Sequence, residues 1–325
     1  MMLRKPALVQ LLDHKRTRNV LIALSGLKFS LEELVGRLSR MNVRSLSSDT
    51  IDRVVAIFPT EEELEMVKSY GGSVAALGKA ERFLYELGKD AHIRSKISWI
   101  QFIKGFDTAR SGVSRSLDTV KRAIESLLNS QGIKQFLMVA LRYGNTMNLG
   151  SKRYDNAYGF TLSSLLSLRH IKAAGRSKNL LLHLLRQVEG YGTSAVSIMD
   201  DLKMVEAASR IDMTYIRAEI VRIKRTIDDI SLFLEGGANT SSFSSCSPSV
   251  SSASDGKNND FLVRFCKEAK EGYEVLLKHG VEVDTLEKML FRRFILDTKK
   301  ATLEEHLQFW STFLLQHLRP ALSQS

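Results

Sequence analysis

The chain has 325 residues, of which 44% are hydrophobic and 26% charged, so it has the composition of a globular protein with a substantial core. Lysine and arginine outnumber aspartate and glutamate by 47 to 36, which favours an acidic partner without specifying its class. Two cysteines do not make a disulfide framework, and no apolar run reaches the roughly 18 residues that cross a bilayer. We therefore expect a cytoplasmic protein with no integral membrane segment.

Periodicity and helix-start signals predict an all-α fold. Only four prolines occur, and apolar residues recur at three- and four-residue steps almost throughout. Ser30 with Glu33 and Thr60 with Glu63 have the capping-box spacing, and Pro59 ends the helix before the second box. Further helices are expected at about 77–90, 93–107, 113–129 and 132–143.

A stretch rich in glycine and asparagine follows, from Gly144 to Ser151, and a second glycine step comes at Ala157-Tyr158-Gly159-Phe160. Glycine and asparagine tolerate left-handed backbone angles, and asparagine side chains can satisfy backbone groups in turns. The stretch therefore predicts the end of one helix and an ordered loop before the next apolar run.

The clearest periodicity is a heptad seam near the middle of the chain. Its spacings of three and four predict one helix of about 22 residues. The apolar positions are Met213, Ile216, Ile220, Ile223, Ile227, Ile230 and Leu234. An antiparallel hairpin within one chain is favoured over a zipper between chains, because a return helix is available, with apolar residues at Leu262, Phe265, Ala269, Tyr273 and Leu276. The serine-rich segment 236–259 between them is expected to be a disordered loop.

Motifs of catalytic and cofactor chemistry are missing. The seven histidines are scattered without metal-ligand spacing, and His183, in a leucine-rich run, is interpreted as a core-edge histidine with one satisfied nitrogen. No phosphate loop, nucleophile elbow or dinucleotide fingerprint occurs, and nothing indicates nucleic-acid binding. We expect no enzymatic activity, no catalytic residue, no metal, no cofactor and no nucleic-acid partner.

The loop Gly144-Asn145-Thr146-Met147-Asn148-Leu149-Gly150, followed by Gly159-Phe160, resembles the Gly-Asn-x-x-Asn-x-Gly…Gly-Phe signature of the formin homology 2 domain. The segment from Leu12 to Leu24 is similar to that family's Leu-Asp-x-Lys-x-x-x-Asn-x-x-Ile-x-Leu pattern. Segments 58–63, 77–84, 159–183 and 294–300 continue the resemblance in order.

The resemblance implies an elongated all-α core with knob, coiled-coil and post subdomains. The expected divisions are a tail at 1–10 and a core at 11–321, with the knob at about 11–110, the coiled-coil region and part of the post at about 111–235, the loop at 236–259, and the return helix and end of the post at 260–321.

Site residues follow from the same resemblance. The family contacts actin through an isoleucine and a lysine, which correspond here to Ile22 and Lys172. Without the resemblance, a core position remains an alternative for Ile22, and Lys172 would be an ordinary solvated lysine. The segment His170 to Ala174 departs from the family's Asp-Thr-Lys pattern. The surface that would receive a partner's N-terminal lasso corresponds to Gly144, Asn145, Asn148, Gly159 and Phe160.

The function implied is an actin-binding module that holds filament barbed ends and promotes or modulates nucleation and elongation within the actin cytoskeleton. The 325 residues show no tryptophan-bearing lasso, so a homodimer or an association with another formin is expected to be weak; a truncated core, an incomplete gene model and a lasso-less paralogue remain open. The alternative is a basic cytoskeletal scaffold that binds microtubules or anionic membrane, with actin-assembly activity lost.

Overall fold

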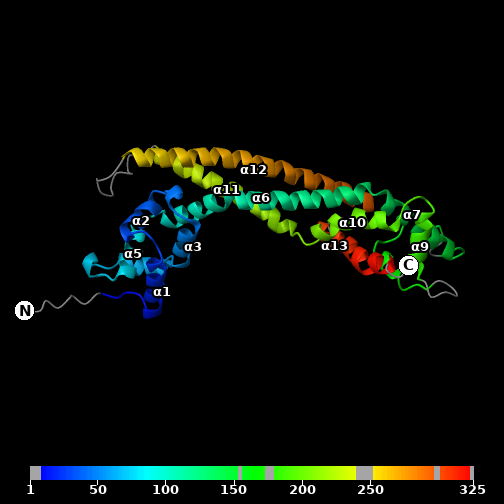
Figure 1. Cartoon of the computed structure of the whole chain (residues 1–325), viewed down its shortest axis with the longest axis horizontal. Coiled ribbons are helices and arrows are strands. Elements are labelled where there is room, and N and C mark those ends of the chain that lie inside the picture. Colours follow the sequence, from blue (N-terminus) through cyan, green and yellow to red (C-terminus); the bar gives the residue numbers. More distant parts are fainter. Residues whose placement is uncertain (1–8, 153–155, 173–178, 239–251, 296–300, 323–325) are drawn as a thin grey trace, which may run out of the picture. The chain divides into compact units, whose positions relative to one another are not determined.

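The computed structural model describes residues 9–152, 156–172, 179–238, 252–295 and 301–322 (Figure 1). Within these ranges the chain forms helices and turns and no β-strand, which confirms the all-α prediction. Two isolated bridges pair Val9 with Leu77 and Lys172 with Asn179. The chain divides into two compact units: the first comprises Met1–Arg110 and Arg222–Tyr273, and the second comprises Ser111–Val221 and Glu274–Ser325.

The N-terminal part of the first unit is built from short helices. They are α1 (His14–Ser25), α2 (Leu31–Ser39), η1 (Val43–Ser45), α3 (Ser48–Ala56), α4 (Glu61–Lys68), η2 (Val74–Ala76) and α5 (Lys79–Gly88), in blue to cyan in Figure 1. Both predicted capping boxes are present, with the Ser30 and Thr60 hydroxyls accepting the backbone N–H of Glu33 and Glu63. Each such cap stabilises its helix by about 1 kcal/mol, so these helix starts are locally encoded.

Three long helices contribute segments to both units: α6 (Ile93–Asn129), α11 (Met213–Ala238) and α12 (Ser252–Phe294). The expected break between 107 and 113 does not occur, because α6 runs through Gly105 and Gly112. A glycine inside a helix costs only about 1 kcal/mol. Burial of apolar side chains on either side of them, Phe106 and Val113 among these, outweighs that cost.

The heptad seam packs within the chain, as predicted. Six of its seven apolar positions are buried, the exception being the half-buried Leu234. In the second unit, Arg217 of α11 binds Asp284 and Glu287 of α12, with Nη2 to oxygen distances of 2.8 and 2.7 Å. In the first unit, the Phe102 ring of α6 packs edge-on against the Phe265 ring of α12. The Arg222 guanidinium of α11 lies over the Phe102 ring, 5.7 Å from the centroid of that ring.

The helices on either side extend further into the serine-rich segment than expected, because α11 continues to Ala238 and α12 begins at Ser252. Residues 239–251 of the expected loop lie outside the described ranges. One tertiary contact accounts for part of the difference: Asn258 donates through Nδ2 to the carbonyls of Arg40 (2.8 Å) and Met41 (3.2 Å). Sequence periodicity alone does not reveal such an anchor.

The second unit also contains α7 (Gln131–Met147), α8 (Ser164–Ser167), α9 (Leu180–Glu189), α10 (Ala195–Ala208), α13 (Leu303–Thr312), the π-helix η4 (Phe313–Leu318) and α14 (Arg319–Leu322). Helix α7 packs on α9 and α10, and α10 packs on α13. The Phe136 ring of α7 lies 5.6 Å from that of Phe313, whose neighbour Trp310 is fully buried. Aromatic burial of this kind stabilises the unit more than any single hydrogen bond within it.

Candidate actin-contact surfaces

The helix that carries Ile22, α1, begins at a strong cap. Asp13 accepts the backbone N–H of Arg16 at 2.8 Å. Val20 and Leu24, four residues apart, are buried on the inner face of the helix. Before the helix, the Val9 N–H donates to the Ala76 carbonyl (2.8 Å), which fixes the chain leading into it. The sequence therefore determines both where α1 starts and which side faces the core.

Arg16 fastens α1 to its neighbours. Its guanidinium makes a two-pronged ion pair with Glu63, with Nε–Oε1 at 2.8 Å and Nη2–Oε2 at 3.0 Å. The same Nη2 donates to the carbonyls of Ile57 (3.1 Å) and Phe58 (3.0 Å) at the end of α3. Glu63 also completes the capping box of α4 by accepting the Thr60 N–H. Both charged side chains are about four-fifths buried, so the clamp holds α1 in one orientation.

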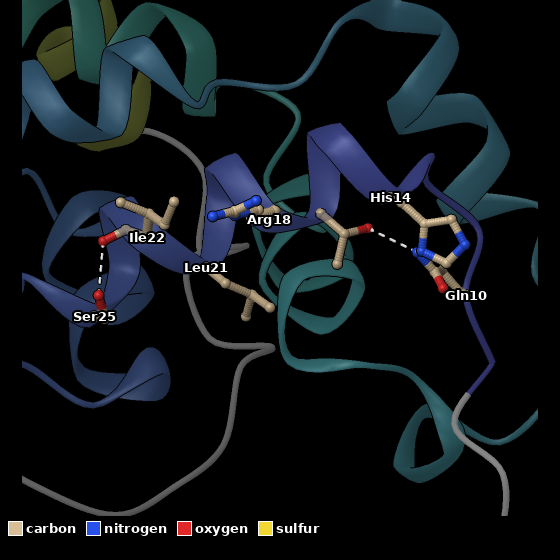
Figure 2. A pocket seen from close by; sticks show the side chains of 7 residues that line it. Gln10, His14, Arg18, Leu21, Ile22 and Ser25 are labelled. Carbon is tan, nitrogen blue, oxygen red and sulfur yellow. Dashed lines mark hydrogen bonds between the residues drawn. The ribbon is translucent and has the colours of Figure 1, made fainter.

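Ile22 points away from the core. Its side chain is 59% exposed although Val20 and Leu24 on the same helix are buried, so the alternative of a core isoleucine is wrong. The Ile22 carbonyl accepts the Ser25 hydroxyl at 2.8 Å, which holds the last turn of α1 (Figure 2). Ile22 and Leu21 form the apolar end of a shallow open groove of about 490 Å³. Ile22 is thus an exposed apolar side chain on a helix whose orientation Arg16 fixes.

Lys172 also lies at the surface, in the second unit. It is exposed and pairs with Asn179 in an isolated bridge, and the adjacent Leu180 N–H donates to the Ile171 carbonyl at 2.8 Å. Residues 173–178 lie outside the described ranges. Lys172 lies in the second unit and Ile22 in the first. Each side chain is exposed within its own unit.

Asn145 organises the loop that carries the glycine signature. Its side chain donates through Nδ2 to the Ala157 carbonyl and accepts the Ala157 N–H through Oδ1, both at 2.9 Å. This bears out the prediction that an asparagine satisfies backbone groups of the loop. Gly150 has a φ of +78°, a left-handed angle that glycine adopts without strain.

Gly144 was expected at the end of a helix, but α7 continues through it to Met147. The last turn of a helix tolerates glycine, and Asn148 caps the helix by donating its N–H to the Gly144 carbonyl at 3.0 Å. Of the other predicted residues, Asn148, Gly159 and Phe160 are exposed. The structure therefore joins Asn145 to the second segment of the signature, leaves Asn148, Gly159 and Phe160 exposed, and half-buries Gly144.

Sequence reasoning placed Phe160 on this surface but missed three other exposed apolar residues, Met147, Leu149 and Tyr158. Leu149 is 78% exposed, Met147 is 60% exposed and Tyr158 is fully exposed, while Phe160 retains 37% exposure. These four residues with Asn145 and Asn148 are called the loop surface below. The exposure of the apolar residues depends on the tertiary fold, because leucine, methionine and phenylalanine are usually buried and the sequence alone does not show which copies are not.

His183 is half-buried, and its Nε2 lies 3.1 Å from the Tyr143 hydroxyl, in agreement with a core-edge histidine that has one satisfied nitrogen. Among the described residues, no three His, Cys, Asp or Glu side chains are grouped as metal ligands would be. None of the described helices combines the length and the apolar character that crossing a membrane requires.

Comparison with known proteins agrees with the signature. The sequence model of the Formin Homology 2 Domain matches residues 2–317. Formin-like protein 3 of Oryza sativa subsp. japonica is 29% identical over 240 residues, which are 74% of this chain and 19% of that protein. Formin-like protein 16 of Arabidopsis thaliana is 30% identical over 226 residues, or 70% of this chain and 31% of that protein.

Formin-like protein 21b of Arabidopsis thaliana is 29% identical over 221 residues, which cover 68% of this chain and 55% of that protein. The chain thus spans between about a seventh and about half of the length of the relatives it matches. Because the family model covers nearly all 325 residues, the chain belongs to the Formin Homology 2 Domain family.

Proposed function

We propose that the chain is an actin-binding module that holds filament barbed ends and promotes or modulates nucleation and elongation. The observation that carries this proposal is the exposure of Ile22 on a clamped helix. The family resemblance assigns actin contact to this isoleucine, and the fold leaves it in solvent. A buried Ile22 would have removed the basis for the assignment.

The physical basis is that of an interface hot spot. Burying a full isoleucine side chain against a hydrophobic cleft contributes about 1.5 to 3 kcal/mol. Because Arg16 already fixes α1, little conformational entropy is lost when the contact forms. Lys172, on its own exposed surface, supplies an electrostatic contact to acidic groups of actin that adds association rate and specificity.

The proposal predicts that Ile22→Ala lowers actin affinity by at least tenfold, the equivalent of about 1.4 kcal/mol. The stability of the chain should change by less than about 0.5 kcal/mol, because the side chain is exposed. Bulk actin assembly over a range of protein concentrations measures the effect. Val55→Ala, a truncation of an exposed apolar residue on α3, is the matched control and should behave as the parent. An Ile22→Ala variant as active as the parent would contradict the proposal.

The loop surface is proposed as the place where a second formin chain docks. Its exposed apolar side chains, Leu149 and Tyr158 above all, and the rigid backbone held by Asn145 support this assignment. The 325 residues by themselves are proposed to associate weakly, because such a surface needs a complementary segment to cover it. Sedimentation over a wide concentration range should therefore show a dimer only at high concentration.

A second candidate function rests on the distribution of charge. Between residues 131 and 186 the only acidic residue is Asp155, whereas the basic residues are Lys134, Arg142, Lys152, Arg153, Arg169, Lys172, Arg176, Lys178 and Arg186. Such a segment attracts any polyanion, including an anionic membrane or a microtubule. Purely electrostatic binding should collapse between about 50 and 200 mM salt, whereas a contact anchored by Ile22 should partly survive.

A further inference from the structure

The groove beside Ile22 has a polar half as well as an apolar end. It is lined by Gln10, His14, Thr17, Arg18, Leu21, Ile22 and Ser25 (Figure 2). No carboxylate is among these lining residues. Thr17 donates to Glu81 at 3.4 Å, but Glu81 is buried beneath the groove wall and does not line it. The groove therefore presents one permanent cation, the Arg18 guanidinium, next to an apolar anchor.

Arg18 differs from the two other cations on the same turns of α1. Arg16 is bound to Glu63, whereas Lys15 is exposed and lies outside the groove. Arg18 is exposed, lines the groove, and makes no hydrogen bond or ion pair with any residue that the structure describes. Residues four apart on a helix are neighbours, so the guanidinium lies one turn from Ile22.

We propose that Arg18 binds a carboxylate of the same actin segment whose surface Ile22 contacts, so that the groove recognises an apolar group and an acidic group side by side. This inference rests on the proposed function. A guanidinium offers a rigid fork of donors that matches the geometry of a carboxylate. A basic partner segment would be repelled by the Arg18 charge. Arg18 therefore also makes the groove select acidic segments over basic ones.

The test compares Arg18→Ala with Lys15→Ala, which removes the same charge from the same helix but from outside the groove. Actin binding is measured at about 50, 100 and 200 mM salt, since screening lengths fall from over 10 Å to below 8 Å in this range. Arg18→Ala should bind about five- to tenfold more weakly at the lowest salt, and its affinity should depend less on salt, as expected for loss of one charge-assisted contact. Lys15→Ala should stay within about twofold of the parent and keep the parent's salt dependence. Arg18→Glu should bind more weakly than Arg18→Ala.

The outcomes separate this inference from the function on which it rests. If the parent binds actin, Ile22→Ala weakens binding by at least tenfold, and the two charge variants behave alike, Arg18 has no specific role and the proposed function stands. If the parent does not bind actin under any condition, both proposals are overturned. Alanine is a good helix former and both positions are exposed, so circular dichroism should show unchanged helicity in each variant.

Discussion

Individual side chains decide which face of α1 is available to a partner. Val20 and Leu24 are buried, and Arg16 bonds Glu63 and the two carbonyls that end α3, so the opposite face of α1, with Arg18 and Ile22, is exposed. The exposure of Ile22 is therefore a consequence of its neighbours. A sequence pattern that contains Val20, Leu21, Ile22 and Leu24 together cannot show which of them is buried.

Loss of the Arg16 clamp should destabilise the first unit. Arg16→Met leaves the Glu63 carboxylate and two backbone carbonyls without their donor, which should cost about 2 to 3 kcal/mol of unfolding free energy. Urea unfolding measures this cost. Arg53→Met, which breaks the exposed pair with Asp49, is the control and should cost less than about 0.5 kcal/mol. Equal effects from the two substitutions would show that Arg16 is an ordinary surface cation.

His306 should make the stability of the second unit depend on pH. It is 5% exposed, its Nε2 accepts the Trp310 indole N–H at 3.1 Å, and burial lowers its pKa from 6.5 to about 4. Burial, with Arg169 and His170 nearby, lowers the pKa of His317 as well. Between about pH 4 and 6.5 the unfolded chain then binds more protons than the folded chain.

The contribution of His306 is therefore complete above pH 6.5 and lost as the pH falls to 4, amounting to about 3 kcal/mol at most. Urea unfolding of the parent and of His306→Gln at pH 7.5, 5.5 and 4.5 measures it, since carboxylates titrate alike in both. The parent should lose more stability than the variant over this range. An identical pH dependence in the two proteins would exclude His306 as a source.

At the scale of elements, features that depend on neighbours in sequence were predictable, and features that depend on tertiary contacts were not. The caps at Ser30 and Thr60 and the seam from Met213 to Ile230 depend on neighbours in sequence, and the structure has them as expected. The continuity of α6 through Gly112 and the early start of α12 depend on burial and on Asn258, which contacts residues more than 200 positions away.

The loop after α7 depends on the side chain of Asn145. Asn145→Asp keeps an acceptor for the Ala157 N–H but loses the donor to the Ala157 carbonyl and places a carboxylate against it. One lost hydrogen bond with an unsatisfied partner costs about 1 to 2 kcal/mol, so amide exchange at 156–160 should accelerate about tenfold. Asn148→Asp, at an exposed side chain, is the control and should leave exchange unchanged. Unaltered exchange in Asn145→Asp would mean that the loop is held by other contacts.

For the chain as a whole, the all-α fold and the family were predictable from periodicity and from the glycine signature. Of the predicted site residues, Ile22, Lys172 and Asn148 prove exposed, Asn145 has a structural role in the loop, and Gly144 lies inside α7. Arg18 and Leu149 were not found from sequence, because an exposed arginine or leucine has no pattern that distinguishes it before its neighbours are placed.

The central claim is that Ile22 anchors the chain to actin, and elongation from preformed filament seeds tests it most directly. The parent and Val55→Ala should change the rate of barbed-end growth in a concentration-dependent manner and leave pointed-end growth unaffected. Ile22→Ala should leave both rates at the value for actin alone. A barbed-end rate that Ile22→Ala changes as strongly as the parent would contradict the account, and the same effect at both ends would replace barbed-end binding with general filament association.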